Sequence, residues 1–246
     1  MLSEKILARG VLDIAFKDVQ SLDKEQYALA RKDYFGASDS SILCGVNLYK
    51  NIDQLIQEKN AKYITKEEQE VGEKPIVKKG YDLEPIILDK AAKEIGATVY
   101  KPDDMFYFKD VKGLSVNYDG ILIKDEEQNI LIPVEAKLVS KYGEKYYNKL
   151  ITHEEADRVD VKYELNTDLE MHIKRKALKF GIPAYYYTQV QQEIAGLDAP
   201  YGYLAAMFDD SWTFKLYLIK RDDYVINKIY DRCINNIDKI ERDTNK

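Results

Sequence analysis

The chain has 246 residues, of which 45% are hydrophobic and 33% are charged, so it is long enough for one large domain with a substantial core. Its net charge of −6 excludes a generally basic surface for nucleic acid but is compatible with a local basic groove. Two cysteines are too few for a disulfide framework or a cysteine-ligated cluster. No apolar run approaches the roughly 20 residues of a membrane-spanning helix, and no small-residue cleavage site follows the N-terminal apolar segment. We therefore expect a soluble cytoplasmic protein without a membrane partner.

The N-terminal part of the chain is predicted to be largely helical. Residues 21–35 begin with the cap-like Ser21 and read as one helix. Ser38 is expected to be the N-cap of a second helix, and a third is expected to begin at Asn51. The charged stretch at residues 65–74 reads as a loop.

A longer helix is predicted over residues 76–95, where apolar residues recur at helical spacing. Gly96 follows as its C-terminal cap. Because Pro85 cannot donate a backbone hydrogen bond, the helix either starts near Asp82 or bends there.

The second half of the chain is predicted to alternate strands and helices. The expected strands are residues 97–100, 105–108, 113–116, 120–123, 129–136, 201–208 and 213–219, with residues 124–129 joining two of them as a hairpin. The expected helices are residues 184–196 and 221–243, and the polar stretch 138–180 is expected to be partly helical and exposed. This order predicts an α/β fold with a central mixed sheet flanked by helices.

Three charged residues stand where the hairpin strands are expected to be buried. Side chains alternate along a strand, so Glu135 and Lys137 share one face, and pairing through the hairpin brings Asp119 close to Glu135. Two adjacent carboxylates repel each other unless a cation lies between them, and hard oxygen ligands suit Mg²⁺ or Mn²⁺. The backbone carbonyl of Ala136 could add a further oxygen, and Lys137 could position or deprotonate a water molecule. The spacing alone is equally typical of exposed charges or a surface ion pair.

Other motifs accompany this constellation in chain order. RKDYFGAS places Arg31 seven residues before Ser38, and GYDLE places Glu84 on the predicted long helix. YYTQVQ places Gln189 on the helix after the hairpin, with Gln191 as the alternative. Taken singly, Glu84 is more often a solvated helix residue, Gln189 could cap a loop, and Arg31 could pair with a nearby acid.

Together the motifs resemble the PD-(D/E)XK nucleases, and within them the phage lambda exonuclease and YqaJ-like viral recombinase family. Asp119 with Glu135, Ala136 and Lys137 matches the central motif, and Tyr118 stands where the family usually has proline. The resemblance implies a restriction-endonuclease-like core formed by a single domain, residues 1–246, with an insertion around residues 138–180.

The resemblance also implies a site. Catalytic roles would fall to Glu84, Asp119, Glu135, Lys137 and Gln189, and the metal ligands would be Asp119, Glu135, Glu84 and the carbonyl of Ala136. A second pocket, formed by Arg31 and Ser38, would bind the 5′-phosphate of a DNA end, since a guanidinium and a helix N-terminus both attract phosphate.

The implied activity is Mg²⁺- or Mn²⁺-dependent 5′–3′ digestion of one strand of linear double-stranded DNA. The 3′ overhang left behind would serve recombination by a phage single-strand annealing protein, in the cytoplasm of a bacterial host that carries a phage or prophage. Family resemblance further implies a trimeric ring around DNA. The alternatives are a site-specific endonuclease or junction resolvase on the same core, and a non-catalytic DNA-binding protein. Lys174, Arg175, Lys176 and Lys179 either contact the DNA backbone or form a solvated helix face.

Overall fold

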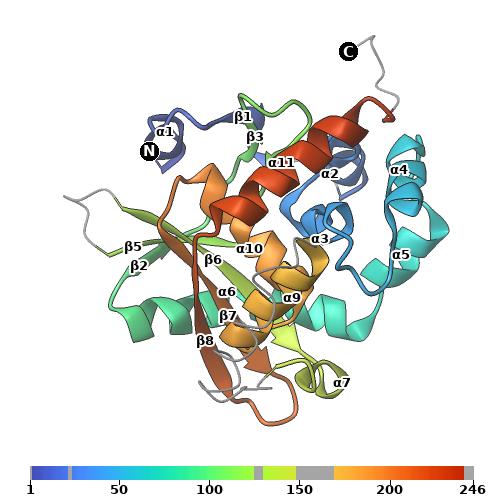
Figure 1. The fold of residues 1–246 in the computed structure, drawn as a ribbon. Helices are drawn as coiled ribbons and strands as arrows, with labels where there is room; N and C mark the ends of the chain where they lie inside the picture. Colours follow the sequence, from blue (N-terminus) through green and yellow to red (C-terminus); the bar gives the residue numbers. More distant parts are fainter. Residues whose placement is uncertain (1, 22–23, 125–129, 148–168, 241–246) are drawn as a thin grey trace.

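A mixed five-stranded sheet forms the centre of the fold (Figure 1). The computed structural model describes residues 2–21, 24–124, 130–147 and 169–240. The strands of this sheet run in the order β2 (Thr98–Tyr100), β5 (Gly120–Ile123), β6 (Leu131–Val139), β7 (Tyr201–Phe208) and β8 (Phe214–Lys220). β6 and β7 are parallel, whereas the other neighbouring pairs are antiparallel. The predicted α/β class and the pairing of β5 with β6 are confirmed, and the turn predicted at 125–129 lies outside the described residues.

A second, three-stranded sheet lies beside the first. It consists of β1 (Leu12–Phe16), β3 (Met105–Phe108) and β4 (Ser115–Val116), in that order. The sequence predicted β3 and β4 as strands, which is confirmed, but it did not assign them to a separate sheet. It also missed β1, which pairs with β3 so that Leu12 lies opposite Phe108. The alternation of side chains indicates a strand but not its partner, because pairing depends on contacts between segments far apart in the chain.

Helices surround both sheets. They are α1 (Leu2–Leu7), α2 (Lys24–Ala30), α3 (Ser40–Leu43), α4 (Ile52–Asn60), α5 (Lys66–Gly72), α6 (Pro75–Ile95), α7 (Lys141–Glu144), α9 (Leu169–Phe180), α10 (Ala184–Gly196) and α11 (Asp223–Ile237). Short 3₁₀ turns lie at Val19–Ser21, Arg31–Asp33 and Ala37–Asp39. None of the helices in the described part of the chain is long and apolar enough to cross a membrane.

The long helix α6 starts earlier than predicted. It begins at Pro75, a favoured first helical residue, and continues through Pro85 without ending there, so a start near Asp82 was wrong. Ile87 and Leu88 are buried against the sheet, and this packing outweighs the hydrogen bond that Pro85 cannot donate. The predicted cap is confirmed.

That cap, Gly96, has a φ of 69°, which is left-handed backbone that glycine adopts without strain. The helix therefore ends where the sequence indicated.

The charged segment predicted as a loop forms α5 instead. Thr65 accepts a hydrogen bond from the backbone N–H of Glu68 at 3.3 Å, and Glu68 accepts one from the backbone N–H of Thr65 at 2.7 Å. This reciprocal pair is a capping box, a local signal that the high charge density of the segment concealed. The Glu68 carboxylate also binds the buried Lys32 ammonium at 3.0 Å, so α5 is joined to the end of α2.

The predicted role of Ser38 as a helix N-cap was wrong. Ser38 lies inside the 3₁₀ turn Ala37–Asp39 and is exposed. Gly36 is the N-cap residue of this turn, and the Asp39 carboxylate accepts a hydrogen bond from its backbone N–H at 2.9 Å. The predicted helix 21–35 is likewise divided, with Ser21 in a separate turn and a 3₁₀ turn after Ala30.

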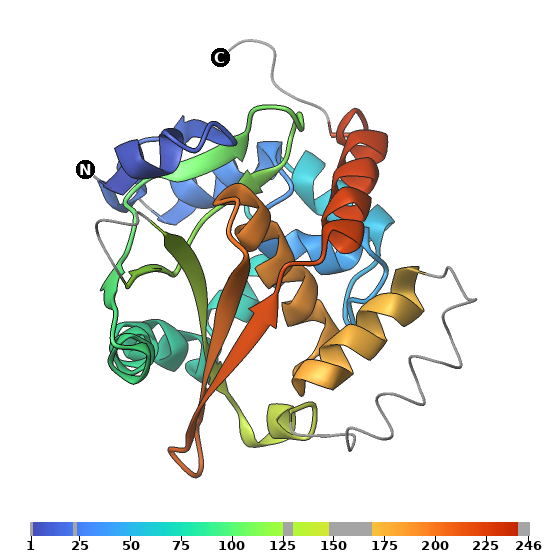
Figure 2. The same ribbon diagram turned by 60° about the vertical axis from the view of Figure 1, so that its left-hand side comes forward.

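The core is built around α10, which lies between the two sheets, while α6 covers the opposite face of the central sheet (Figure 2). Val190 and Ile194 of α10 pack on the central sheet at Gly202, where an added Cβ would come within 3.1 Å of both side chains. On the other side of the helix, Gln192 donates a hydrogen bond to the carbonyl of Ser115 in β4 at 2.8 Å. The predicted end of α10 at Gly196 is confirmed.

Candidate active site

The hairpin of β5 and β6 brings together the acidic residues that the sequence singled out. Gly120 pairs with Val134, so Asp119, which immediately precedes β5, lies beside the segment Glu135–Lys137. The backbone N–H of Ala136 donates a hydrogen bond to Oδ2 of Asp119 at 3.0 Å. This bond fixes the Asp119 carboxylate against β6.

Glu135 is the most enclosed of these acids, with only 2% of its surface exposed. Its carboxylate contacts the Lys137 ammonium and the Gln189 side-chain amide. Burial raises the pKa of Glu135, the charge of Asp119 raises it further, and Lys137 offsets part of the increase, which leaves a pKa of about 7. Glu135 is therefore held in a site where negative charge is costly.

Lys137 remains protonated in this site. Burial lowers its pKa, but the charges of Glu135 and Asp119 outweigh burial and raise the pKa above its usual value. Its ammonium also lies 5.4 Å from the ring centroid of Tyr186, a cation–π distance. A protonated lysine can orient a water molecule and stabilise developing negative charge, so this geometry favours those roles over deprotonation.

The two glutamine candidates on α10 have different surroundings. The Gln189 amide donates to Glu135 and, at 3.2 Å, to Glu193. Gln191 faces away from the acids, donating to the carbonyl of Lys220 at 2.8 Å and accepting from the backbone N–H of Asp222 at 2.8 Å. Residues two apart on a helix point in different directions, and this separates Gln189 from Gln191.

Glu193 is a member of the site that sequence reasoning missed. It is buried, and its pKa is raised well above the usual value, first by burial and then by the charge of Glu135. Its spacing from Gln189 was the available signal, because residues four apart lie on the same helix face. Glu193 of α10 therefore adds a third carboxyl group to those of Asp119 and Glu135.

Glu84 lies at the edge of this arrangement. Its carboxylate forms an ion pair with Lys101, just beyond the end of β2. Burial lowers the pKa of Lys101, but Glu84 first and Asp119 second outweigh it and raise the pKa, so the charges of both acids act on Lys101. Within the described residues, no three His, Cys, Asp or Glu side chains are arranged to share one metal ion.

The donor set nevertheless fits a hard divalent cation. Asp119 and Glu135 contribute carboxylate oxygens from adjacent strands, and Ala136 lies between Glu135 and Lys137 with its backbone N–H held by Asp119. Burial first and the charge of Asp119 second raise the pKa of Glu135, and a divalent cation would offset the repulsion between the two carboxylates. Among the described residues, His172 pairs with Asp222 and the Cys233 thiol with the carbonyl of Lys112, so the acidic group offers oxygen ligands, which favour Mg²⁺ or Mn²⁺ over zinc.

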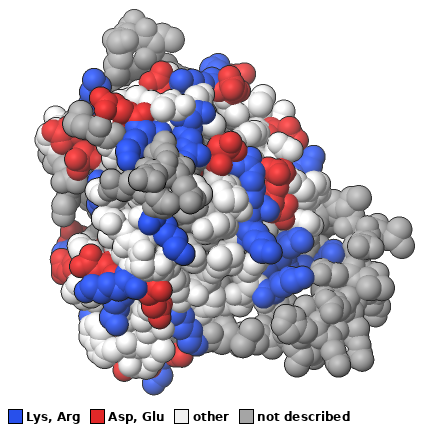
Figure 3. Space-filling view, turned by 90° about the vertical axis from the view of Figure 1, so that its left-hand side faces the viewer, with Lys and Arg blue, Asp and Glu red and all other residues white. Residues whose placement is uncertain are grey.

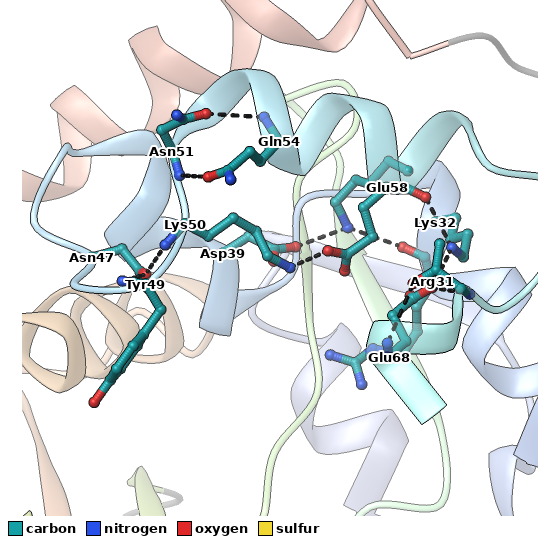
Figure 4. A network of polar contacts seen from close by, with 12 residues as sticks. Arg31, Lys32, Asp39, Asn47, Tyr49, Lys50, Asn51, Gln54, Glu58 and Glu68 are labelled. Carbon is teal, nitrogen blue, oxygen red and sulfur yellow. Dashed lines mark hydrogen bonds and ion pairs between the residues drawn. The ribbon is translucent and has the colours of Figure 1, made fainter. Parts of the chain in front are cut away.

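Arg31 and Ser38 line a separate cavity of about 370 Å³ between α2, α4 and α5. Its other cations are paired: Lys32 with Glu68 at 3.0 Å, Lys59 with Asp39 at 2.9 Å, and Lys50 with Glu58 (Figure 4). The Arg31 guanidinium lies 5.6 Å from the ring centroid of Tyr27 and forms no ion pair with a described residue. Arg31 is therefore the cation of this cavity that is available for an anion.

Tyr27 links the cavity to the acidic site. Its hydroxyl accepts a hydrogen bond from the side-chain amide of Asn117, which lies two residues before Asp119. The charges of Arg31 and Lys101 both act on Tyr27, and burial, the larger effect, leaves its pKa raised. Elsewhere basic and acidic side chains are interspersed, as Figure 3 shows for the face at the left of Figure 1. The cationic character needed for an anionic ligand is therefore local.

Comparison with known proteins agrees with this geometry. The family model of the YqaJ-like viral recombinase domain matches residues 26–197, a range that contains Arg31, the acidic residues and α10. The chain belongs to the YqaJ-like viral recombinase family. This membership confirms the family that the sequence motifs indicated.

Solved structures of an alkaline exonuclease show a similar fold. The alkaline exonuclease LHK-Exo from Laribacter hongkongensis is 14% identical with a TM-score of 0.52, and the alignment covers 86% of this chain and 89% of that one. The structure of LHK-Exo in complex with dAMP gives a TM-score of 0.53 at 14% identity, covering 86% and 90%. Comparison with curated protein sequences gave no match. This YqaJ-like family member thus has the restriction-endonuclease-like fold predicted from its sequence.

Proposed function

We propose that this chain is a metal-dependent deoxyribonuclease that digests one strand of linear double-stranded DNA from 5′ to 3′ and leaves a 3′ overhang. The observation that carries the proposal is the hydrogen bond from Ala136 to Asp119, which joins the two halves of the acidic motif. Family membership and the fold shared with an alkaline exonuclease support it. That relative has also been solved in complex with dAMP, which supports a nucleotide ligand for this fold.

Each residue of the acidic site has a role in this proposal. Asp119, Glu135 and the carbonyl of Ala136 would hold Mg²⁺ or Mn²⁺, with Glu84 reaching the ion directly or through water. When bound, the ion acts as a Lewis acid and lowers the pKa of a coordinated water. Lys137, which stays protonated, orients the attacking water and stabilises charge on the phosphate.

Gln189 holds the Glu135 carboxylate in place and presents its amide toward the same space. The largely enclosed setting strengthens these electrostatic contacts, because bulk water screens them less there than at the surface.

The Arg31 cavity would select the DNA end. A guanidinium presents paired N–H donors that match phosphate oxygens, and Ser38 adds an exposed hydroxyl at the same cavity. A 5′-phosphate bound there would place the first internucleotide linkages toward the acidic site, to which the hydrogen bond between Asn117 and Tyr27 connects the cavity. End recognition favours an exonuclease over a site-specific endonuclease.

The wider biological setting is proposed on the family resemblance. The 3′ overhang would be passed to a phage single-strand annealing protein, and three copies would form a ring around DNA. We treat residues 1–246 as one domain in which residues 138–180 are an insertion. α7 and α9 lie within that insertion and agree with its predicted partial helicity, whereas residues 148–168 lie outside the described part.

The proposal is tested by incubating purified protein with a linear duplex that is 5′-phosphorylated and labelled on one strand, with and without Mg²⁺. We expect nucleotides to be released from the 5′ end in the presence of Mg²⁺ and a closed circular duplex to stay intact. Cleavage of the circle would favour a site-specific endonuclease or junction resolvase. End binding without nucleotide release would favour a non-catalytic DNA-binding protein.

A further inference from the structure

Four tyrosines gather between the cavity and Lys137. The rings of Tyr185 and Tyr186, at the start of α10, lie edge to face with centroids 4.5 Å apart. The pKa of Tyr185 is raised first by burial and then by the neighbouring hydroxyls of Tyr186, Tyr49 and Tyr146. Tyr147, which follows Tyr146 in the chain, has its ring centroid 6.4 Å from that of Tyr186, so the segment of Tyr146 packs against the start of α10. We call Tyr49, Tyr146, Tyr185 and Tyr186 the tyrosine cluster.

The tyrosine cluster extends from the Arg31 cavity to Lys137 of the acidic site. Tyr49 lines the cavity that contains Arg31 and Ser38. Tyr186 lies against the Lys137 ammonium, with its ring centroid 5.4 Å away. A strand whose end is held at Arg31 and whose backbone reaches Lys137 would pass this cluster.

Packing of the protein core does not account for the exposed members. Tyr49 is 78% exposed and Tyr146 is 40% exposed. Tyr147 shows the contrast, because it is 4% exposed and packs edge to face on Phe208, with ring centroids 5.4 Å apart. The Tyr49 and Tyr146 rings thus keep exposed surface, and the Lys145 ammonium lies 5.0 Å from the ring centroid of Tyr146, where it could also attract a phosphate.

Tyr49 is also held in place by its backbone. The Asn47 side chain accepts hydrogen bonds from the backbone N–H groups of Tyr49 at 2.8 Å and of Lys50 at 2.9 Å. Such a side-chain-capped turn restricts the backbone that carries the ring. In Figure 4 the Tyr49 side chain points away from the ion pairs around Glu58. An aromatic ring presented to solvent on a restricted turn loses little conformational entropy when a flat ligand stacks on it.

We propose that Tyr49, Tyr146 and Tyr185 form a stacking platform for nucleobases of the strand being digested. The proposal rests on the proposed function, because it needs that strand to run from Arg31 to Lys137. Stacking between bases and aromatic side chains tolerates any sequence, since every base has a π face, and an enzyme that digests DNA regardless of sequence requires that tolerance. The platform would hold the bases while Arg31 holds the terminal phosphate.

Binding of a duplex with an unpaired 5′-phosphorylated end tests the platform. The DNA carries 2-aminopurine at the first, second or third nucleotide, and fluorescence and affinity are measured in EDTA so that the DNA is not consumed. We expect quenching at one or more of these positions with the unchanged protein. Alanine at a platform residue costs about 1–3 kcal/mol of stacking, so Tyr49→Ala is expected to weaken affinity about 5- to 150-fold, whereas Tyr49→Phe keeps the ring and the affinity.

Two controls separate stacking from other effects. Tyr224 of α11 is 39% exposed, which matches the exposure of Tyr146, but it lies beside His172 of α9. Tyr224→Ala should therefore bind DNA as the unchanged protein does, whereas Tyr146→Ala should bind it more weakly. With an abasic nucleotide at the quenched position, Tyr49→Ala and the unchanged protein should bind equally. If Tyr49→Ala weakens binding of normal and abasic DNA equally, the platform is overturned. It is also overturned if Tyr49→Ala changes the subunit number of the protein and leaves DNA binding unchanged.

The same assay distinguishes failure of the platform from failure of the proposed function. If the unchanged protein with Mg²⁺ releases nucleotides but shows no quenching at any position, the platform is wrong and the nuclease assignment stands. If it neither binds nor digests DNA ends, the proposed function is wrong, and the platform is overturned with it.

Discussion

Asp119 and Ala136 are joined by a 3.0 Å hydrogen bond from the Ala136 backbone N–H to the Asp119 carboxylate. The bond crosses from the residue before β5 to the middle of β6, so it holds the first acid of the motif against the strand that carries Glu135 and Lys137. A backbone donor also orients Asp119 without supplying a competing charge. The acidic site is therefore organised by the sheet itself.

Lys137→Ala should abolish turnover and leave binding of DNA ends intact. The ammonium contacts Glu135 inside the acidic site, whereas Arg31 lies in the separate cavity. Losing one preorganised electrostatic contact of this kind typically lowers the rate about 10²- to 10³-fold. Nucleotide release with Mg²⁺ measures the rate, and titration of a 5′-phosphorylated duplex in EDTA measures binding. An unchanged rate would remove Lys137 from the mechanism.

Arg31→Ala should reduce the preference for 5′-phosphorylated over 5′-hydroxyl ends. Hydrogen bonds to charged groups contribute about 1.5–3 kcal/mol, so the preference should fall about 10- to 150-fold. Competition between the two ends for binding measures it. Lys112→Ala is the control, because Lys112 pairs with Asp238 on the surface and is not among the residues lining the cavity. If Lys112→Ala lowers the preference as much as Arg31→Ala does, the Arg31 cavity is not the end-binding site.

Glu135→Gln should make the metal-free protein less sensitive to alkaline pH. The pKa of Glu135 is raised from 4.5 to about 7 by burial and by Asp119, so the folded protein takes up a proton that the unfolded chain has released. The associated stability is present below pH 4.5 and is lost as the pH rises through 7, by about 3 kcal/mol in total. Urea unfolding in EDTA at pH 5 and pH 8 measures the difference. The same pH dependence in Glu135→Gln as in the unchanged protein would show that another group causes it.

Gln189→Ala should weaken the metal site, whereas Gln191→Ala should weaken only the packing of α10. Gln189 donates to Glu135 and Glu193, so its loss should weaken Mg²⁺ binding, which calorimetry measures. Gln191 ties α10 to Lys220 and Asp222, so its loss should lower the free energy of unfolding by about 1–3 kcal/mol and leave Mg²⁺ affinity unchanged. Reversed results would mean that Gln191 supports the metal site.

Gly120→Ala should destabilise the sheet next to Asp119. A Cβ at Gly120 would lie 2.9 Å from both Leu88 of α6 and Val99 of β2, so these side chains would have to move. Overpacking of this kind costs about 1–3 kcal/mol, which urea unfolding measures. Gly72→Ala, at the end of α5, meets no atom within 4 Å and should not destabilise the protein. Equal stability of both variants would show that α6 does not pack this closely on β5.

Short-range patterns in the sequence were enough to predict much of this molecule. Alternation along β6 placed Glu135 and Lys137 on one face, and both now face α10. Helical spacing and a terminal glycine predicted the ends of α6 and α10 at Gly96 and Gly196. These signals are local, because backbone geometry alone sets their period and their caps.

Other local signals were misread for lack of context. The capping box of Thr65 and Glu68 identifies α5, but the run of charges around it is equally typical of a loop. Pro85 would end an isolated helix, and only burial of α6 against the sheet shows that it does not. Ser38 has the chemistry of an N-cap, yet it lies inside the 3₁₀ turn whose N-cap is Gly36.

Contacts between distant segments were decided by the tertiary structure. The pairing of β1 with β3 joins segments far apart in the chain. The packing of α10 on the hairpin decides that Gln189, and not Gln191, contacts Glu135, and it brings Glu193 to the acidic site. The packing of β2 brings Lys101 near the acids. Residue types and their spacing along the chain were enough to identify the family and the acidic motif. The neighbours that shift their pKa values lie far away in the chain, and only burial in a common core brings them within electrostatic range.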